Sequence, residues 1–273
     1  EAANDITRRT GQPVIVENKP GANGLIAAQQ VARAAPDGYT VFITTMTTQS
    51  VNPHIYKKLP YDPVADFIPV AMISKGARGL VVRNTEDQPK SVAELTARMQ
   101  AAGSKLSFAS GNTSSLVAGK TYSNAVSSPA LHVPYKGNPQ AVTDLMAGAV
   151  DFMFSDLTVA TPLVQQGRLR GLGVTGPARV STLPDVPTMR EAGMPIELSV
   201  WNGAYLPAKT PPAVVARLNE LLNLATKSKE GQERLRQTGG SVDTMSAEEF
   251  AKFNEQELLN WGRAVRGAGI QPE

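Results

Sequence analysis

Short runs of residues that favour β-strands alternate with helical stretches along the chain, and this alternation restricts the fold more than any other feature of the sequence. The β-rich runs are residues 14–17, 40–44, 79–83, 106–110, 151–155 and 171–175. Strands that alternate with helices are typical of βαβ units with parallel strands. Because 273 residues are enough for one large or two medium domains, we expect an α/β protein with two lobes.

The last part of the chain carries a strong helix signal. Ser246 and Glu249 have the spacing of a capping box, in which each side chain bonds to the backbone N–H of the other residue. Phe250, Trp261 and Val265 then follow on one face at roughly helical spacing. We therefore predict that the chain closes on an amphipathic helix.

Composition excludes several classes of protein. The 27 basic and 24 acidic residues give a net charge of +3 without a run of like charge, so nucleic acid is not an expected partner. The apolar stretches are far shorter than the roughly 20 residues of a membrane-spanning helix, so we expect a soluble protein. The chain has no cysteine, which excludes thiolate chemistry and leaves the compartment open. Residues 1–10 are polar and lack an apolar central region, so we do not expect them to be a signal peptide.

The common catalytic motifs are missing. Gly119, Lys120 and Thr121 look like the end of a phosphate-binding loop, but Ser114 stands where that loop requires glycine. The sequence contains no Gly-x-Ser-x-Gly elbow and no Ser-x-x-Lys pair. The two histidines lack neighbours at metal-ligand spacing. We predict no catalytic residue, no metal site and no cofactor.

Polar loops follow three of the predicted strands, where the carboxyl ends of an open α/β sheet form a ligand crevice. The predicted ligand-binding residues are Thr45, Thr47, Thr48 and Gln49 after the run 40–44, Ser110, Gly111, Asn112, Thr113, Ser114 and Ser115 after the run 106–110, and Asp156 after the run 151–155. The loop 110–115 leads into a predicted helix, whose free N–H groups around residues 113–115 favour an anion such as a carboxylate. Serine, threonine and asparagine also serve as N-caps and turn formers, and each loop taken singly fits that role as well.

Several segments in a fixed order resemble a known family. They are residues 11–22 (GQPVIVENKPGA), 36–40 (PDGYT), 52–53 (NP), 56–63 (YKKLPYDP), 132–137 (HVPYKG) and 183–188 (LPDVPT). Together they cover nearly the whole chain and resemble the Bug family, the periplasmic receptors of tripartite tricarboxylate transporters. The resemblance implies a type II periplasmic-binding-protein (Venus flytrap) fold that captures a small organic acid: a dicarboxylate, a carboxylated aromatic or an acidic amino acid. It also implies the membrane subunits of such a transporter as partner, a periplasmic location and a non-enzymatic monomer.

We place the chain crossings between the lobes near residues 103–106 and 198–200. We expect lobe one to comprise residues 1–103 and 200–273, and lobe two residues 104–199. The family pattern begins with a strand and a ligand loop before the first helix, and we expect both to lie upstream of residue 1. In the family an aspartate directly follows the phenylalanine that is Phe154 here, whereas Ser155 intervenes in this chain, so the role of Asp156 stays open. A sensor module with the same cleft and a hydrolase on the same scaffold are the alternative functions.

Overall fold

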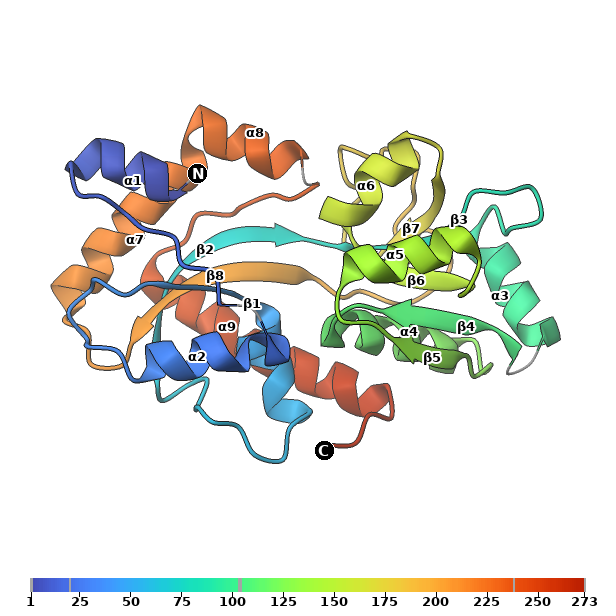
Figure 1. Cartoon of the computed structure of the whole chain (residues 1–273), viewed down its shortest axis with the longest axis horizontal. Coiled ribbons are helices and arrows are strands. Elements are labelled where there is room, and N and C mark those ends of the chain that lie inside the picture. The colour runs from blue at the N-terminus through green and yellow to red at the C-terminus, as the bar shows by residue number, and fades with distance from the viewer. Residues whose placement is uncertain (1, 20, 103–104, 238, 273) are drawn as a thin grey trace.

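The computed structural model describes residues 2–19, 21–102, 105–237 and 239–272, and it has two lobes, each built on its own β-sheet (Figure 1). The long strands β2 (Phe67–Gly76) and β8 (Val200–Pro207) run side by side from the first lobe toward the second. The two-lobed α/β architecture expected from the sequence is therefore present.

The first lobe contains a sheet whose described strands have the order β1-β8-β2, with β1 at Phe42–Thr45 and all pairs antiparallel. Its helices are α1 (Ala2–Thr10), α2 (Leu25–Ala32), α7 (Pro212–Lys227), α8 (Lys229–Gln237) and α9 (Ala247–Gly267), with the short turns η1 (Ala22–Gly24), η2 (Thr47–Val51) and η3 (Asn52–His54). Trp201 and Tyr205 of β8 pack against Phe250 of α9, and Trp261 joins the same core. Helix α9 begins with the predicted Ser246–Glu249 capping box, which is confirmed.

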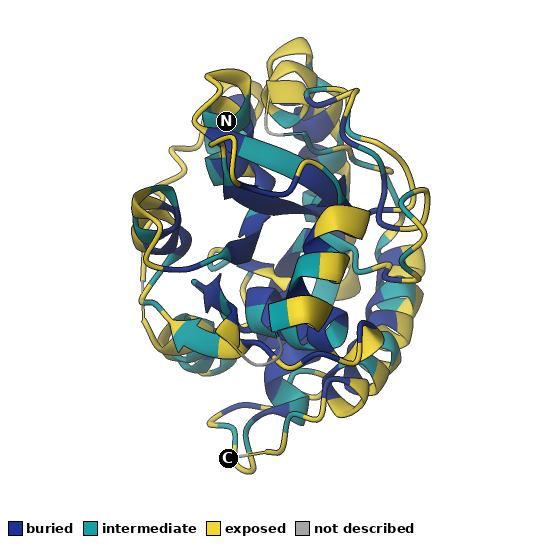
Figure 2. Cartoon of the chain, turned by 90° about the vertical axis from the view of Figure 1, so that its right-hand side faces the viewer, coloured by how far each residue is buried: buried dark blue, intermediate teal, exposed yellow. Residues whose placement is uncertain are grey.

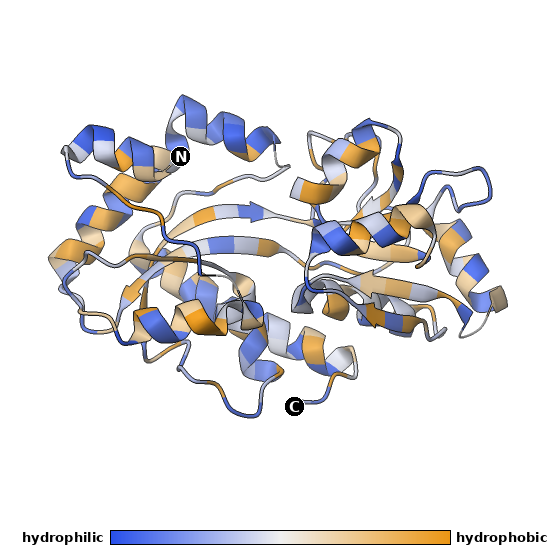
Figure 3. Ribbon diagram, viewed as in Figure 1, coloured by the Kyte–Doolittle hydropathy of each residue, from blue (hydrophilic) through white to orange (hydrophobic). Residues whose placement is uncertain are grey.

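The second lobe contains a mixed sheet. Its strand order is β5-β4-β6-β3-β7, with β3 at Arg78–Arg83, β4 at Ser107–Ser110, β5 at Leu131–Pro134, β6 at Phe152–Asp156 and β7 at Leu169–Val174. Strand β4 pairs in parallel with β5 and β6, whereas β3 is antiparallel to both of its neighbours. The helices are α3 (Val92–Ala102), α4 (Thr113–Ala125), α5 (Asn138–Ala147) and α6 (Leu157–Gln165). Figure 2 shows buried strands inside a shell of helices with exposed outer faces, and Figure 3 shows the matching change of hydropathy across those helices.

The first crossing between the lobes lies at Ala77, between β2 and β3, which differs from the predicted boundary at residue 103. Leu80 and Val82 of β3 and Leu95 of α3 belong to the core of the second lobe. A strand that is apolar on both faces is buried only in the interior of a sheet, which is why β3 lies between β6 and β7. Residues 103 and 104 lie outside the described residues. We now propose lobes of residues 1–76 with 200–273, and 77–199.

The segment 14–17, predicted as a strand, has no regular secondary structure and belongs to neither sheet. Ile15 is 88% exposed, because no strand among the described residues pairs with this segment. The expectation of a further strand before residue 1 stays a prediction.

Thr175, directly after β7, connects the two chain crossings. Its hydroxyl accepts a hydrogen bond from the backbone N–H of Arg78 (3.0 Å) and donates one to the carbonyl of Leu198 (2.7 Å). Farther along the junction, α4 packs on α9, and the side chain of Asn124 donates to the carbonyl of Gly267 (3.0 Å). These contacts set how the candidate site of one lobe faces the other.

Candidate functional site

The first turns of three helices of the second lobe meet at one place. Helices α4, α5 and α6 each start after one of the neighbouring parallel strands β4, β5 and β6, so their first residues lie at the same edge of the sheet. A Cβ atom added to Gly111 would lie 2.2 Å from the backbone nitrogen of Asn138, the first residue of α5. The side chains of Asn112 (3.2 Å) and Asn138 both donate to Oδ2 of Asp156, the residue before α6. The positive ends of three helix dipoles therefore converge on Asp156.

A buried cation completes this cluster. Arg78, at the start of β3, is paired with Asp156 in the antiparallel ladder between β3 and β6. Its Nη1 lies 2.6 Å from Oδ1 of Asp156, and its Nη2 donates to the hydroxyl of Ser114. Burial lowers the pKa of Arg78, and the charge of Asp156 opposes that shift. The Arg78 side chain is 3% exposed and that of Asp156 35%, so the carboxylate faces outward from the cluster and the guanidinium lies behind it.

The start of α4 is partly capped by its own chain. The side-chain oxygen of Asn112 accepts from the backbone N–H of Ser115 and from the hydroxyl of Ser114, both at 3.0 Å. The N–H of Ser115, predicted to point at a ligand, is thus already bonded. The N–H groups of Thr113 and Ser114 have no acceptor within the helix, because they lie in its first turn.

Several buried polar atoms have no hydrogen-bond partner in the described part of the chain. At the candidate site they are the hydroxyl of Ser115, Nε of Arg78, the side-chain oxygen of Asn138 and both amide atoms of Gln49. A buried polar group without a partner costs about 1–3 kcal/mol, so each such group favours a further partner, which a bound water or a ligand can supply. Gln49 belongs to η2 of the first lobe and Ser115 to α4 of the second. Because η2 packs against α4, both elements lie at the lobe junction.

The other predicted residues of the first lobe bond mainly within their own turn. The hydroxyls of Thr44 and Thr48 lie 2.7 Å apart, and the hydroxyl of Thr45 accepts from the N–H of Thr47 (3.1 Å). Tyr61 donates to the carbonyl of Thr48 (2.6 Å). These contacts shape the turn, and among the four predicted residues Gln49 is the one with wholly unpartnered polar atoms.

Ser110 contacts a histidine that the sequence analysis left outside the site. Its hydroxyl lies 2.7 Å from Nε2 of His132, whose ring lies against Phe108. Burial, with a smaller contribution from Lys120, lowers the pKa of His132, so the imidazole is neutral near pH 7. No carboxylate of the described residues is hydrogen-bonded to this ring, so the arrangement lacks the third member of a catalytic triad.

Arg78 and Asn138 were missed as site residues. Arg78 precedes an apolar strand and resembles an ordinary solvent-facing strand end, and only the β3–β6 register brings it to Asp156. The sequence signal for Asn138 is Gly137 before it and Pro139 after it, a start typical of a helix. Within the described ranges no group of three or more histidine or acidic residues could hold a metal ion, and no helix is long and apolar enough to cross a membrane.

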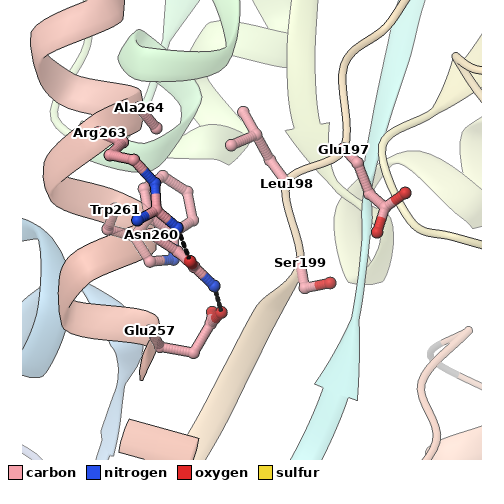
Figure 4. A pocket seen from close by; sticks show the side chains of 8 residues that line it. All are labelled: Glu197, Leu198, Ser199, Glu257, Asn260, Trp261, Arg263 and Ala264. Atoms are coloured by element: carbon pink, nitrogen blue, oxygen red, sulfur yellow. Dashed lines mark hydrogen bonds between the residues drawn. The ribbon is translucent and has the colours of Figure 1, made fainter. Parts of the chain in front are cut away.

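A separate pocket of about 280 Å³ lies between residues 197–199 and α9 (Figure 4). Its polar groups bond to protein neighbours: Glu257 accepts from the indole N–H of Trp201 (3.1 Å) and from Asn260 (2.8 Å), and Asn260 accepts from Arg263 (2.6 Å). These bonds leave the pocket a weaker candidate than the cluster at Asp156.

Comparison with known proteins gives a consistent result over the whole chain. The model of the TctC family, described as the tripartite tricarboxylate transporter family receptor, matches residues 1–270. The structure is similar to Rpa4515 of R. palustris with adipate, with 29% identity, a TM-score of 0.93 and coverage of 100% of this chain and 92% of that one. It is similar to the periplasmic binding protein BugD, with 31% identity, a TM-score of 0.89 and coverage of 100% and 92%. MatC from Rhodopseudomonas palustris with bound malate has 28% identity and a TM-score of 0.86, with 97% and 92% covered.

Proposed function

The chain belongs to the tripartite tricarboxylate transporter receptor family, as its resemblance to the Bug receptors predicted, and from this premise we propose that it captures a small carboxylate between its lobes. The predicted periplasmic-binding-protein architecture is confirmed by the close match of its whole length to such receptors. In this proposal the protein works outside the cytoplasm and delivers the ligand unchanged to the membrane subunits of a transporter.

The observation that carries the proposal is the meeting of three helix N-termini with buried, unpartnered donors. At one edge of the sheet, Nε of Arg78 and the hydroxyl of Ser115 are donors without acceptors among the described residues, and the N–H groups of Thr113 and Ser114 have no acceptor within their helix. Anions are stabilised at helix N-termini, and each charge-assisted hydrogen bond contributes about 1.5–3 kcal/mol. A carboxylate loses water when the lobes close around it, and donors already in place offset that loss.

The negative charge of Asp156 does not oppose this proposal, because Arg78 neutralises it within the protein. The solved structures of Rpa4515 with adipate and of MatC with bound malate are consistent with it, since both compounds are dicarboxylates. Closure would bring Gln49 of the first lobe against the ligand held by the second lobe, as in hinged two-domain receptors.

Calorimetric titration of the purified protein tests the proposal. We expect one molecule of a dicarboxylate, such as adipate, succinate or malate, to bind per chain and to be recovered chemically unchanged. A folded protein that binds none of a broad panel of aliphatic and aromatic carboxylates would contradict it, and turnover of a bound ester or acid would favour an enzyme.

A further inference from the structure

We propose that this site, given the function proposed above, selects carboxylates that carry no ammonium group, because Asp156 is committed to partners within the protein. An acidic residue at the edge of a ligand site is the ordinary acceptor for the ammonium group of an amino acid. Here both oxygens of that residue are already engaged: Oδ1 by Arg78, and Oδ2 by Asn112 and Asn138. A ligand ammonium group that bonded to Asp156 would therefore share its oxygens with the Arg78 guanidinium and the two asparagine amides.

Arg78 cannot withdraw to make room. Its side chain is almost fully buried, and its backbone is bonded twice to Thr175: its N–H donates to the hydroxyl (3.0 Å), and its carbonyl accepts from the N–H (2.9 Å). An ammonium beside Asp156 would lie next to a fixed guanidinium, and the repulsion between two like charges is strong where water is excluded. The starts of α4, α5 and α6 add positive potential at the same place.

The unpartnered side-chain acceptors among the described residues of the site are neutral. The side-chain oxygens of Asn138 and Gln49 lack partners among the described residues and can accept from a hydroxyl group. They supply no charge to offset the desolvation of an ammonium group, which is far more costly than that of a hydroxyl. The site is therefore suited to simple carboxylates and hydroxy acids, and amino acids of the same size are disfavoured.

Matched ligand pairs test this inference. Succinate and aspartate, glutarate and glutamate, and 3-phenylpropanoate and phenylalanine each differ by one ammonium group, and their affinities are measured by calorimetry at pH 7. For each pair in which a member binds, we expect the compound without the ammonium group to bind at least tenfold more tightly. Equal or tighter binding of the amino acids would overturn the inference and leave the proposed function standing, whereas a folded protein that binds no carboxylate would overturn both.

The variant Asp156→Asn distinguishes this explanation from the alternative, in which Asp156 binds the ammonium group of the ligand. If Asp156 were the acceptor for a ligand ammonium, the variant would lose affinity for the amino acids alone. We expect instead that the ratio of affinities within each pair does not shift further against the amino acid when Asp156 is replaced, and a loss of affinity confined to the amino acids would overturn the inference. Glu220→Gln, which makes the same chemical change at the exposed Arg217–Glu220 pair of α7, is the control and should leave all affinities unchanged.

Discussion

Arg78 and Asp156 occupy directly paired positions in the antiparallel ladder between β3 and β6, and their side chains form an ion pair 2.6 Å long. The pair lies where three helices begin, so it ties the first crossing of the chain between the lobes to the candidate ligand site. Since Arg78 also bonds to Ser114 of α4, any movement at the crossing acts on the helix start proposed to hold the carboxylate.

Gly111 lies at the closest approach between two of the helix starts. A Cβ atom at this position would be 2.2 Å from the backbone nitrogen of Asn138 and 2.5 Å from the carbonyl carbon of Gly137, and backbone atoms cannot give way as a flexible side chain can. We expect Gly111→Val to separate α4 from α5 and to weaken carboxylate binding at least tenfold in calorimetric titration.

The matched control for this change is Gly267→Val at the end of α9, where an added Cβ atom meets no atom within 4 Å and the backbone carbonyl that accepts from Asn124 is retained. This variant should retain the affinity of the unmodified protein. Unchanged affinity in a folded Gly111→Val protein would remove the loop 110–115 from the site.

Ser115 should contribute to binding and not to stability. Its hydroxyl is buried without a partner among the described residues, so Ser115→Ala removes an unpaired polar group from the free protein. We expect the free energy of unfolding to stay equal or to rise by up to about 1 kcal/mol, while loss of a hydrogen bond to the ligand lowers affinity about tenfold. Chemical denaturation and calorimetry measure the two effects separately.

Ser123 offers a control on the same helix. Its hydroxyl is also buried and unpartnered in the described structure, but it lies more than two turns from the start of α4. Ser123→Ala should change stability in the same direction and leave affinity unchanged. Equal loss of affinity in both variants would show that the helix as a whole, and not its first turn, governs binding.

Local signals predicted much of the fold. The capping box of Ser246 and Glu249 starts α9 as predicted, because both halves of that motif lie within four residues of each other. The boundary that we predicted at residue 103 differs from the one that we now propose at residue 77, because the apolar run of β3 fits a strand in either sheet. Only tertiary pairing with β6 and β7 decides which sheet contains it.

The residues of the candidate site were likewise predicted only in part. Ser110 and Asp156 end strands β4 and β6, Asn112 and Ser114 come soon after β4, and the sequence predicted that such strand ends would meet. Arg78 could be assigned to the candidate site only from the register between β3 and β6, because no neighbouring residue in the sequence distinguishes a buried cation from an exposed one. The structure also assigns different roles to similar residues: the hydroxyl of Thr48 bonds within its turn, whereas the amide of Gln49 is unpartnered among the described residues.

Thr175 should stabilise the junction between the lobes. Thr175→Val keeps the shape of the side chain but leaves the N–H of Arg78 and the carbonyl of Leu198 without this partner in a buried region. We expect the free energy of unfolding to fall by about 1–3 kcal/mol, measured by urea denaturation. Thr143→Val, on an exposed face of α5 where the hydroxyl bonds to the carbonyl of Pro139, should cost much less. A similar loss in both variants would mean that Thr175 has no special role at the crossings.

His132 should make stability depend on pH. Burial and Lys120 lower the pKa of His132 in the folded protein below its ordinary value of 6.5, so the unfolded chain binds a proton more readily than the folded one. The contribution of this residue is therefore fully present above about pH 6.5 and declines as the pH falls from there toward the lowered pKa. In His132→Gln, which can still bond to Ser110, the decrease in unfolding free energy between pH 7.5 and pH 5 should be smaller than in the unmodified protein. The other titrating groups are common to both proteins, so the difference between the two slopes isolates the histidine. Identical slopes would mean that His132 titrates in the folded protein as it does in the unfolded chain.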